Sequence, residues 1–230
     1  MLMLRRAEDR GRTKLDWLDS RHTFSFGDYH DERYMGFRDL RVINEDRVNP
    51  AKGFGTHSHA NMEIVTYVLE GAVEHRDSTG NQIVIKAGDV QRMTAGTGIS
   101  HSEYNPSKTD AVHFLQIWIL PNRSGLQPGY EQRSFEFDEG KWILLAAAAS
   151  RNGALAIHQD VELSLARLRE RRQMTYAIKS GRHVWLQITR GAVQVNGTAL
   201  EGGDGAAISD EEILELVAPR DAEVLLFDLA

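Results

Sequence analysis

The 230-residue chain contains no cysteine. Disulfide bonds, Cys-ligated zinc and a thiol nucleophile are therefore excluded, and any metal site must use His, Asp or Glu. No stretch approaches the ~20 consecutive apolar residues of a membrane-spanning helix. The apolar run before Arg5 is also too short for a secretory signal. These absences predict a soluble protein of the cytoplasm that binds no membrane.

An excess of basic residues is also missing. Lys and Arg number 27 against 33 Asp and Glu, which gives a formal net charge of −6. A protein that binds nucleic acid through its own surface usually carries a basic patch, so this balance predicts no direct nucleic-acid partner. Hydrophobic residues make up 41% of the chain, enough to form the core of one large β domain or two smaller ones.

Short apolar stretches broken by glycine and turn residues follow one another from residue 62. Residues 64–69 lead into Glu70-Gly71, and residues 82–85 lead into Gly88-Asp89. Strands of about five residues with a turn signal roughly every ten are typical of β-sandwiches and barrels. The pattern therefore predicts an all-β fold. Residues 111–120 form the last of these strands, whose parity lets either His113 or Gln116 face the interior.

The segments outside this pattern are predicted separately. In residues 22–27, His22, Phe24 and Phe26 alternate with small polar residues, which predicts a strand with an aromatic face. His22 is interpreted there as a packed or hydrogen-bonded residue and not as a ligand. Residues 121–140 are rich in Gly, Pro and polar residues and are interpreted as a linker, after which the strand pattern restarts.

The second half resembles a degenerate copy of the first. Residues 68–73 are similar to residues 188–193, and Gly88-Asp89 is similar to Gly203-Asp204. Aligning the two glycine turns places Ala177 and Lys179 where His57 and His59 stand in the first half. This comparison predicts one metal site, in the first half. The remaining histidines near the strands are then expected to be structural or exposed, namely His75, His158 and His183.

Two pairs of ligand-type residues dominate the first half. His57 and His59 are separated by one residue, as are His101 and Glu103. In an extended strand this spacing points both members to one face, so two facing strands would bring the four side chains around a divalent metal. The alternative is that they only pack inside a barrel. That arrangement would leave buried polar groups poorly satisfied, at ~1–3 kcal/mol each.

Glu63 competes with Glu103 for the carboxylate position. It follows His59 by four residues, so it faces inward as well if the strand is unbroken from His57. Glu103 is favoured because it shares a strand with His101, and the other glutamate would then orient a ligand by hydrogen bonding.

The order of glycines, histidines and acid resembles the two signature motifs of the cupin superfamily and, more narrowly, a bacterial pirin. The likeness spans the first 120 residues, and the second half matches by architecture. It is carried by His22-Thr23-Phe24-Ser25-Phe26, Gly36-Phe37, Leu40-Arg41-Val42, Gly55-Thr56-His57-Ser58-His59, Glu63, Tyr67-Val68-Leu69-Glu70-Gly71, Thr94-Ala95-Gly96-Thr97-Gly98-Ile99 and His101-Ser102-Glu103.

This resemblance implies a bicupin, two jelly-roll β-barrels of antiparallel strands. Residues 1–125 would form the metal-binding cupin domain and residues 126–230 a degenerate cupin domain without a metal site. The implied ligands are His57, His59, His101 and Glu103. They would hold one divalent transition metal, iron first, with nickel, manganese, cobalt, copper or zinc as alternatives. Four protein ligands leave about two coordination positions open.

The resemblance also implies an activity. Pirins of this type resemble quercetin 2,3-dioxygenases, which open the central ring of a flavonol with O2 and release carbon monoxide. The partners would be O2 and a small flavonol-like aromatic substrate, with Glu103 as the catalytic proton acceptor. Candidate wall residues, which otherwise form core, are Phe24, Phe26, Met93, Phe114 and Trp118. The alternative is a metal-dependent regulatory protein that binds a transcription factor. A monomer is favoured.

Overall fold

The computed structural model describes residues 1–230, and almost all of its regular structure is β-strand. The exception is one 3-10 turn, η1 (Glu32–Tyr34). No helix is long and apolar enough to cross a membrane. The chain folds into two compact units. The N-terminal unit comprises Gly11–Phe135 with Ile157–Gln159, and the C-terminal unit comprises Met1–Arg10, Glu136–Ala156 and Asp160–Ala230.

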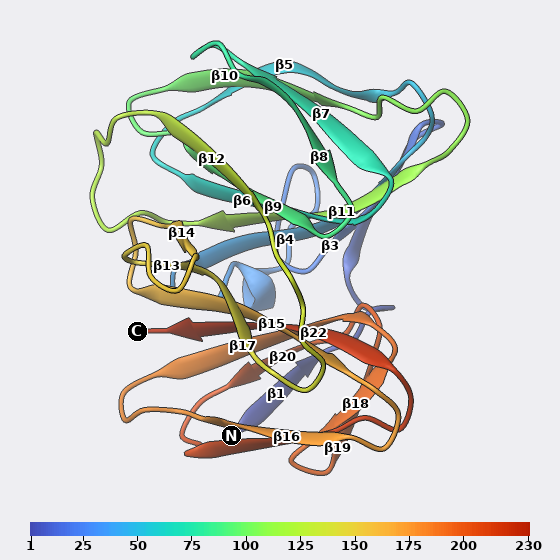
Figure 1. Ribbon diagram of the computed structural model, residues 1–230, viewed down its shortest axis with the longest axis vertical. Helices are drawn as coiled ribbons and strands as arrows, with labels where there is room; N and C mark the ends of the chain where they lie inside the picture. Colours follow the sequence, from blue (N-terminus) through green and yellow to red (C-terminus); the bar gives the residue numbers. More distant parts are fainter. The chain divides into compact units, whose positions relative to one another are not determined.

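The N-terminal unit consists of two antiparallel sheets that form the two layers of a barrel (Figure 1). One sheet has seven strands, in the spatial order β12 (Gly129–Ser134), β9 (Asp89–Thr94), β6 (Glu63–Glu70), β11 (Val112–Ile119), β4 (Leu40–Val48), β3 (Leu18–His22) and β2 (Gly11–Lys14). The other has four strands, in the order β5 (Gly53–His59), β10 (Ile99–Tyr104), β7 (Ala72–Asp77) and β8 (Gln82–Lys86).

The C-terminal unit repeats this arrangement. Its seven-stranded sheet has the order β1 (Leu2–Arg5), β20 (Gly205–Ile208), β17 (His183–Arg190), β22 (Ala222–Leu229), β15 (Val161–Leu168), β13 (Ile143–Ala147) and β14 (Leu155–Ala156). Its four-stranded sheet has the order β16 (Gln173–Ala177), β21 (Ile213–Val217), β18 (Ala192–Val195) and β19 (Thr198–Glu201). All pairs are antiparallel except β13 with β14. The predicted all-β bicupin is confirmed.

The boundaries of the two units do not follow a single cut at residue 125. Strand β1 pairs with β20 and therefore belongs to the C-terminal unit. Strand β12 pairs with β9 and extends the N-terminal sheet, although it lies in the segment interpreted as a linker. That linker prediction was wrong because β12 is a partly exposed edge strand, whose polar sequence carries no apolar alternation.

The strand predicted over residues 22–27 was also wrong in its extent. Strand β3 ends at His22, and the chain then turns, with Phe26 and Tyr29 exchanging backbone hydrogen bonds of 3.0 Å. Phe24 is buried. The aromatic alternation therefore reflects packing of a loop and not strand periodicity.

The internal repeat is visible in matching turns. Gly71 and Gly191 follow β6 and β17 with φ of +76° and +74°, a region that favours glycine. Asp89 accepts a hydrogen bond from the backbone N–H of Lys86, as Asp204 does from that of Glu201. The two barrels therefore share a frame built from equivalent residues.

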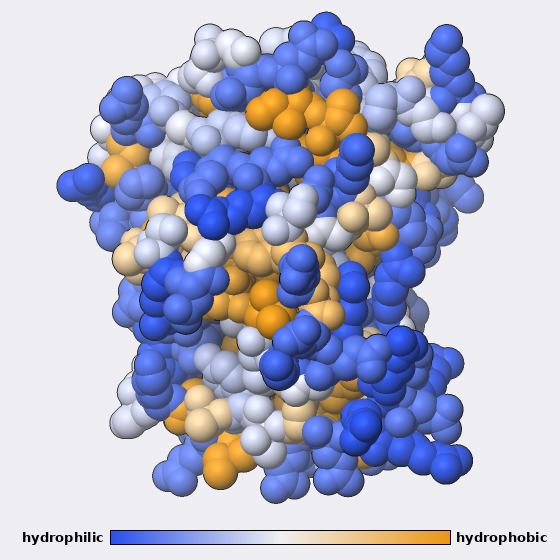
Figure 2. All heavy atoms as spheres, viewed as in Figure 1, coloured by the Kyte–Doolittle hydropathy of each residue, from blue (hydrophilic) through white to orange (hydrophobic).

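The interior of the N-terminal barrel is apolar at one end of its strands and polar further along them. One end is apolar and comprises Leu18, Val48, Val68, Val73, Ile85, Val112 and Phe114. Because side chains alternate along a strand, the positions two residues further on share the same face. Those positions carry the buried polar residues Ser20, Asp46, Thr66 and His75 and the partly buried Gln116. Polar side chains dominate most of the outer face in view, with apolar residues in small groups (Figure 2).

Candidate metal centre

Neighbouring strands β5 and β10 bring three histidines together in the N-terminal barrel. His101 pairs directly with His57, and Ile99 pairs with His59. The ring centroids of His101 lie 4.4 Å from those of His57 and 5.0 Å from those of His59. One nitrogen from each of the three rings lies within 4.8 Å of the others. The H-x-H spacing on an extended strand places His57 and His59 on one face, and the pairing of β10 with β5 adds His101.

The nitrogens of this group are available to a cation. His57 donates Nδ1–H to the carbonyl oxygen of Gly55 at 2.8 Å, which leaves its Nε2 lone pair free. His101 is 1% exposed, and neither of its ring nitrogens has a hydrogen-bond partner. An unpaired buried polar atom costs ~1–3 kcal/mol, a penalty that binding to a metal ion relieves. The three histidines therefore fit a divalent transition metal, for which imidazole is a preferred ligand.

The protonation states also suit a metal ligand. Burial lowers the pKa of His101 to about 3, with further lowering by His57 and His59. Burial and the neighbouring His57 lower the pKa of His59 to about 4. Both rings are consequently neutral near pH 7, which is the form that binds metals.

Glu103 follows His101 by two residues on β10 and is also buried in the barrel. A β-bulge separates the two residues in the pairing with β5. Glu103 groups with His101 and His75, whose ligand atoms lie within 4.8 Å of one another, and is not in the group of three histidines. It nevertheless lines the same cavity as His57 and His59. Three of the four predicted ligands therefore line this cavity, and His101 lies next to all three of them.

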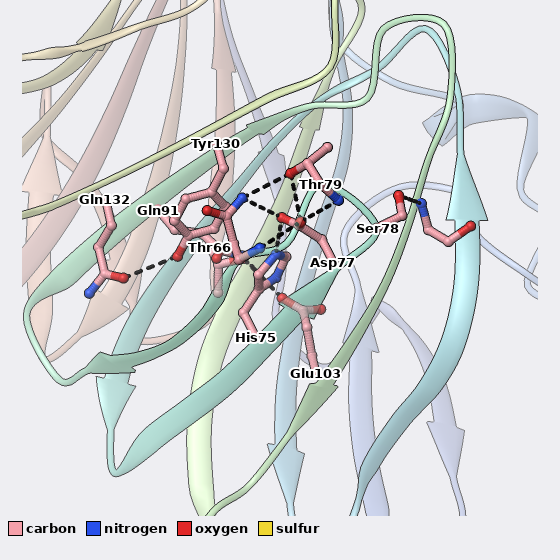
Figure 3. Close-up of polar contacts among 11 residues, drawn as sticks. Thr66, His75, Asp77, Ser78, Thr79, Gln91, Glu103, Tyr130 and Gln132 are labelled. Carbon is pink, nitrogen blue, oxygen red and sulfur yellow. Dashed lines mark hydrogen bonds and ion pairs between the residues drawn. The ribbon is translucent and has the colours of Figure 1, made fainter.

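Three donors hold the Glu103 carboxylate. Gln116 donates to Oε2 at 2.6 Å, and Gln91 and Thr66 donate to Oε1 at 3.2 and 3.4 Å; Figure 3 shows the Gln91 and Thr66 side of this network. Burial raises the pKa of Glu103 to about 7, the negative charge of Asp46 adds to the rise, and the three hydrogen bonds oppose it. The carboxyl group is thus oriented and titrates near neutrality.

The structure separates Glu63 from the histidines. Residues 60–62 interrupt the strand after His59, so the parity continued from His57 does not hold. Thr66 faces Glu103, and Glu63, an odd number of residues away on β6, faces the opposite side. There Glu63 accepts hydrogen bonds from Thr94 at 3.1 Å and His158 at 3.2 Å. Of the two glutamates, only Glu103 lies next to a member of the three-histidine group, His101.

Sequence reasoning missed His75, which was expected to be structural or exposed by default. His75 is fully buried, donates Nε2–H to Asp77 at 3.0 Å, and has its ring centroid 5.3 Å from that of His101. A signal was present in the sequence, because His75 follows the core residue Val73 by two positions and therefore shares its inward face.

A cavity of about 120 Å³ opens from the metal-ligand end of the barrel. Its apolar wall consists of Leu18, Phe26, Phe54 and Trp118, and its polar wall of Thr13, Ser20, His22, Asn44, Asp46 and Gln116. Trp118 packs edge-on against His59, with centroids 4.9 Å apart.

The residues that line the cavity show which of the candidate wall residues face it and which belong to the core. Among the five candidate wall residues, Phe26 and Trp118 line it, whereas the others are buried outside it, namely Phe24, Met93 and Phe114. His22 is hydrogen-bonded, as predicted, through Nδ1–H to Asn44 at 2.8 Å and from Thr13 at 2.9 Å.

The parity of β11 is settled by two contacts. Gln116 faces inward, where it holds Glu103. His113 faces the other way and lies 2.9 Å from the carboxylate of Glu45. The interior position of Gln116 follows from its place two residues beyond the core residue Phe114.

Comparison with known proteins agrees with this architecture. A family model described as pirin matches residues 4–119, and a model described as quercetinase C-terminal cupin domain matches residues 144–229. The chain belongs to the pirin family. It is 51% identical over its whole length to a quercetin 2,3-dioxygenase of Escherichia coli strain K12, of which the match covers 99%.

Two further pirins extend the comparison. A pirin-like protein of Caulobacter vibrioides is 41% identical, with 93% of each chain covered. The crystal structure of the bacterial pirin YhhW of Escherichia coli in complex with nickel(II) superimposes with a TM-score of 0.96 at 49% identity, covering 100% of this chain and 99% of YhhW. These relatives are similar along their full lengths, so both barrels of this chain are pirin barrels.

Proposed function

We propose that this protein is a dioxygenase of the quercetin 2,3-dioxygenase type, which uses one divalent metal to open the central ring of a flavonol-like substrate with O2. The observation that carries the proposal is the grouping of three imidazoles, one of which also lies beside the buried carboxylate of Glu103, next to a part-aromatic cavity. The dioxygenase name of the Escherichia coli relative and the nickel(II) complex of YhhW support it.

His57, His59, His101 and Glu103 would hold the metal in this proposal. A divalent metal with these ligands supplies a Lewis acid with about two open positions, for an anionic substrate oxygen and for O2. Iron is our first assignment. Sites of this kind are selected by geometry and metal supply as well as by affinity, so nickel and the other divalent metals are tested beside it.

Glu103 acts as the proton acceptor. Its pKa of about 7 allows it to take a proton from the flavonol 3-hydroxyl near neutral pH. The proton moves from the hydroxyl oxygen to a Glu103 carboxylate oxygen, and the substrate becomes an anion. Gln116 and Gln91 keep the carboxylate oriented during this transfer, because both donate to it, from strands β11 and β9 on either side of β6.

The cavity walls position the substrate. Phe26 and Trp118 are in edge contact, with centroids 5.4 Å apart, and together with Phe54 they present aromatic surface to a flat ring system. This surface excludes water on one side of the substrate. The polar residues that line the same cavity, Asn44 among them, offer hydrogen-bonding groups, which would select an aromatic compound with polar substituents.

The direct test starts from protein stripped of metal and reloaded separately with Fe²⁺, Ni²⁺, Mn²⁺, Co²⁺, Cu²⁺ or Zn²⁺. We expect at least one loaded form to remove the flavonol absorbance band in air, with one CO released for each O2 consumed. His101→Gln should abolish this reaction by removing a ligand. His30→Gln, in an exposed loop, should retain it.

Two results would overturn the proposal. One is an unchanged flavonol band with every metal across a panel of flavonols. The other is equal turnover by the metal-free protein and the loaded protein, which would remove the role of the metal.

A further inference from the structure

A buried histidine–aspartate pair, His75 and Asp77, lies next to the proposed metal ligand His101. The side chains of His75 and Asp77 are both completely buried and lie 3.0 Å apart (Figure 3). Asp77 also accepts hydrogen bonds from the backbone N–H groups of Thr79 and Asn81 at 2.9 and 3.2 Å, and from their side chains at 2.7 and 2.9 Å. This pair is absent from the ligand set of the proposed function.

Asp77 is an anion, and it fixes the tautomer of its neighbour. Burial alone would raise the pKa of Asp77, but the hydrogen bonds from Thr79, His75 and Asn81 outweigh burial and lower it. A carboxylate only accepts hydrogen bonds, so His75 must carry its proton on Nε2, the nitrogen that faces Asp77. Nδ1 of neutral His75 therefore presents a lone pair.

The Nδ1 lone pair of His75 lies near the ring of His101, and both rings contain nitrogens that lack hydrogen-bond partners. Nδ1 of His75 is buried and has no partner, and neither ring nitrogen of His101 has one. Ligand atoms of the two rings lie within 4.8 Å, and the ring centroids are 5.3 Å apart. When one nitrogen of His101 binds a metal, the other carries a proton that requires an acceptor. The unpartnered nitrogen of His75 is an acceptor of this kind beside it.

We propose that His75 is a positioning residue for the metal ligand His101. Its Nδ1 accepts the ring N–H of His101, and Asp77 holds His75 in the tautomer that makes this possible. The chain Asp77–His75–His101 thereby fixes which nitrogen of His101 faces the metal and increases its basicity. Tyr130 packs against His75, with centroids 4.8 Å apart, and restrains its ring. The inference rests on metal binding, one part of the proposed function.

Substitutions of His75 test the acceptor. His75→Phe keeps a packed ring but removes the acceptor, and we expect it to weaken Co²⁺ binding by ~10–100-fold, the usual effect of losing such a partner. His75→Gln keeps one donor and one acceptor and should recover most of the affinity. His183→Gln, in the C-terminal unit, is the matched control and should bind Co²⁺ as the wild type does. Affinity is measured by competition with a chromogenic chelator.

Asp77→Asn tests the tautomer while leaving His75 in place. An amide nitrogen facing Nε2 of His75 would donate to it and move the ring proton to Nδ1. His75 would then present N–H, and not a lone pair, to His101. We expect Co²⁺ affinity to fall about as far as in His75→Phe, by ~10–100-fold. Circular dichroism of each variant checks that the β structure is retained.

Two spectroscopic readouts complete the test, and the first needs only the wild type. Long-range ¹H–¹⁵N correlation spectra of the Zn²⁺-loaded protein should show His75 as the Nε2–H tautomer. X-ray absorption of the Co²⁺-loaded protein should show the same number of imidazole ligands in the wild type and in His75→Gln.

The outcomes separate this inference from the proposed function. The Nδ1–H tautomer of His75, or unchanged Co²⁺ affinity in both His75→Phe and Asp77→Asn, overturns the positioning role. Loss of one imidazole in His75→Gln also overturns it, because His75 would then be a ligand. A wild type that binds no metal overturns the proposed function together with the inference. Metal binding without flavonol turnover overturns the dioxygenase alone.

Discussion

Replacing Asp46 with asparagine should stabilise the metal-free protein increasingly as the pH rises from 5 to 8. Asp46 is 4% exposed, and its Oδ1 has no hydrogen-bond partner. Burial raises its pKa from 3.8 to about 7; the hydrogen bond from Ser20 opposes this rise, and the neighbouring Glu45 adds to it. Because the folded pKa lies above the unfolded one, the stability that Asp46 contributes is fully present below pH 3.8 and is lost as the pH rises through 7.

The magnitude follows from the width of this window. Between pH 5 and pH 7 the unfolded chain has an ionised Asp46 and the folded protein a protonated one. Each pH unit in that interval removes ~1.4 kcal/mol from the free energy of unfolding, so the wild type loses ~2–3 kcal/mol by pH 8. The asparagine variant has no such titration. The difference in unfolding free energy between variant and wild type should therefore grow by ~2–3 kcal/mol from pH 5 to pH 8.

The assay is urea unfolding of the EDTA-treated proteins at several pH values, followed by tryptophan fluorescence. Asp28→Asn, at an exposed loop position, is the control and should show a difference that does not vary with pH. A constant difference between Asp46→Asn and the wild type over this range would refute the assignment of a buried carboxyl that ionises near pH 7.

The remaining predictions concern the proposed metal centre and the glycine turn at Gly191. Glu103→Gln should lower the metal content of the purified protein, whereas Glu63→Gln should retain it; the reverse result in elemental analysis would exchange their roles. Ni²⁺ or Cu²⁺ should quench the fluorescence of Trp118, which packs against a ligand ring, and Trp118→Phe should lose that quenching. Gly191→Ala should destabilise the protein by ~2 kcal/mol or more beyond Gly80→Ala in urea unfolding, because its Cβ would lie 1.8 Å from a backbone oxygen, whereas that of Gly80 meets nothing within 4 Å.

The parts of the site that sequence predicted are those set by one strand and its period. His57 and His59 share a face because they are two residues apart on β5, and His101 and Glu103 do so on β10. The pairing of the two strands was an expectation from the cupin resemblance, since no local pattern fixes which strands are neighbours. Its register, with His101 opposite His57, emerges only in the folded sheet.

The parts that sequence did not predict depend on strand breaks and distant pairing. The parity of Glu63 failed because residues 60–62 leave the strand, and a single residue of irregularity reverses every later face. The role of β12 was hidden because its edge position relaxes the apolar alternation. His75 was undervalued because its partners, Asp77 and His101, meet it only through the pairing of β7 with β10.

The register of the two barrels explains why an equivalent centre is not expected in the second. In the N-terminal sheet Thr66 lies opposite both Gln91 and Gln116, the three residues that donate to Glu103. Counting from the matched turns, the corresponding residues of the C-terminal sheet are Leu186, Ala206 and Leu226, which pair in the same register and belong to a closed apolar core.

A carboxylate placed among those three side chains would find no donor from them, and an unpaired buried charge costs several kcal/mol. In the C-terminal barrel, the absence of the histidines and the absence of side chains that could hold an acid are therefore coupled. Once the donors that hold the acid have become leucine and alanine, restoring the imidazoles alone would not rebuild a four-ligand centre. In the N-terminal barrel the donors form one connected network, because Gln91 donates to Thr66 at 2.8 Å and Thr66 to Gln116 at 2.9 Å, and this network surrounds the Glu103 carboxylate.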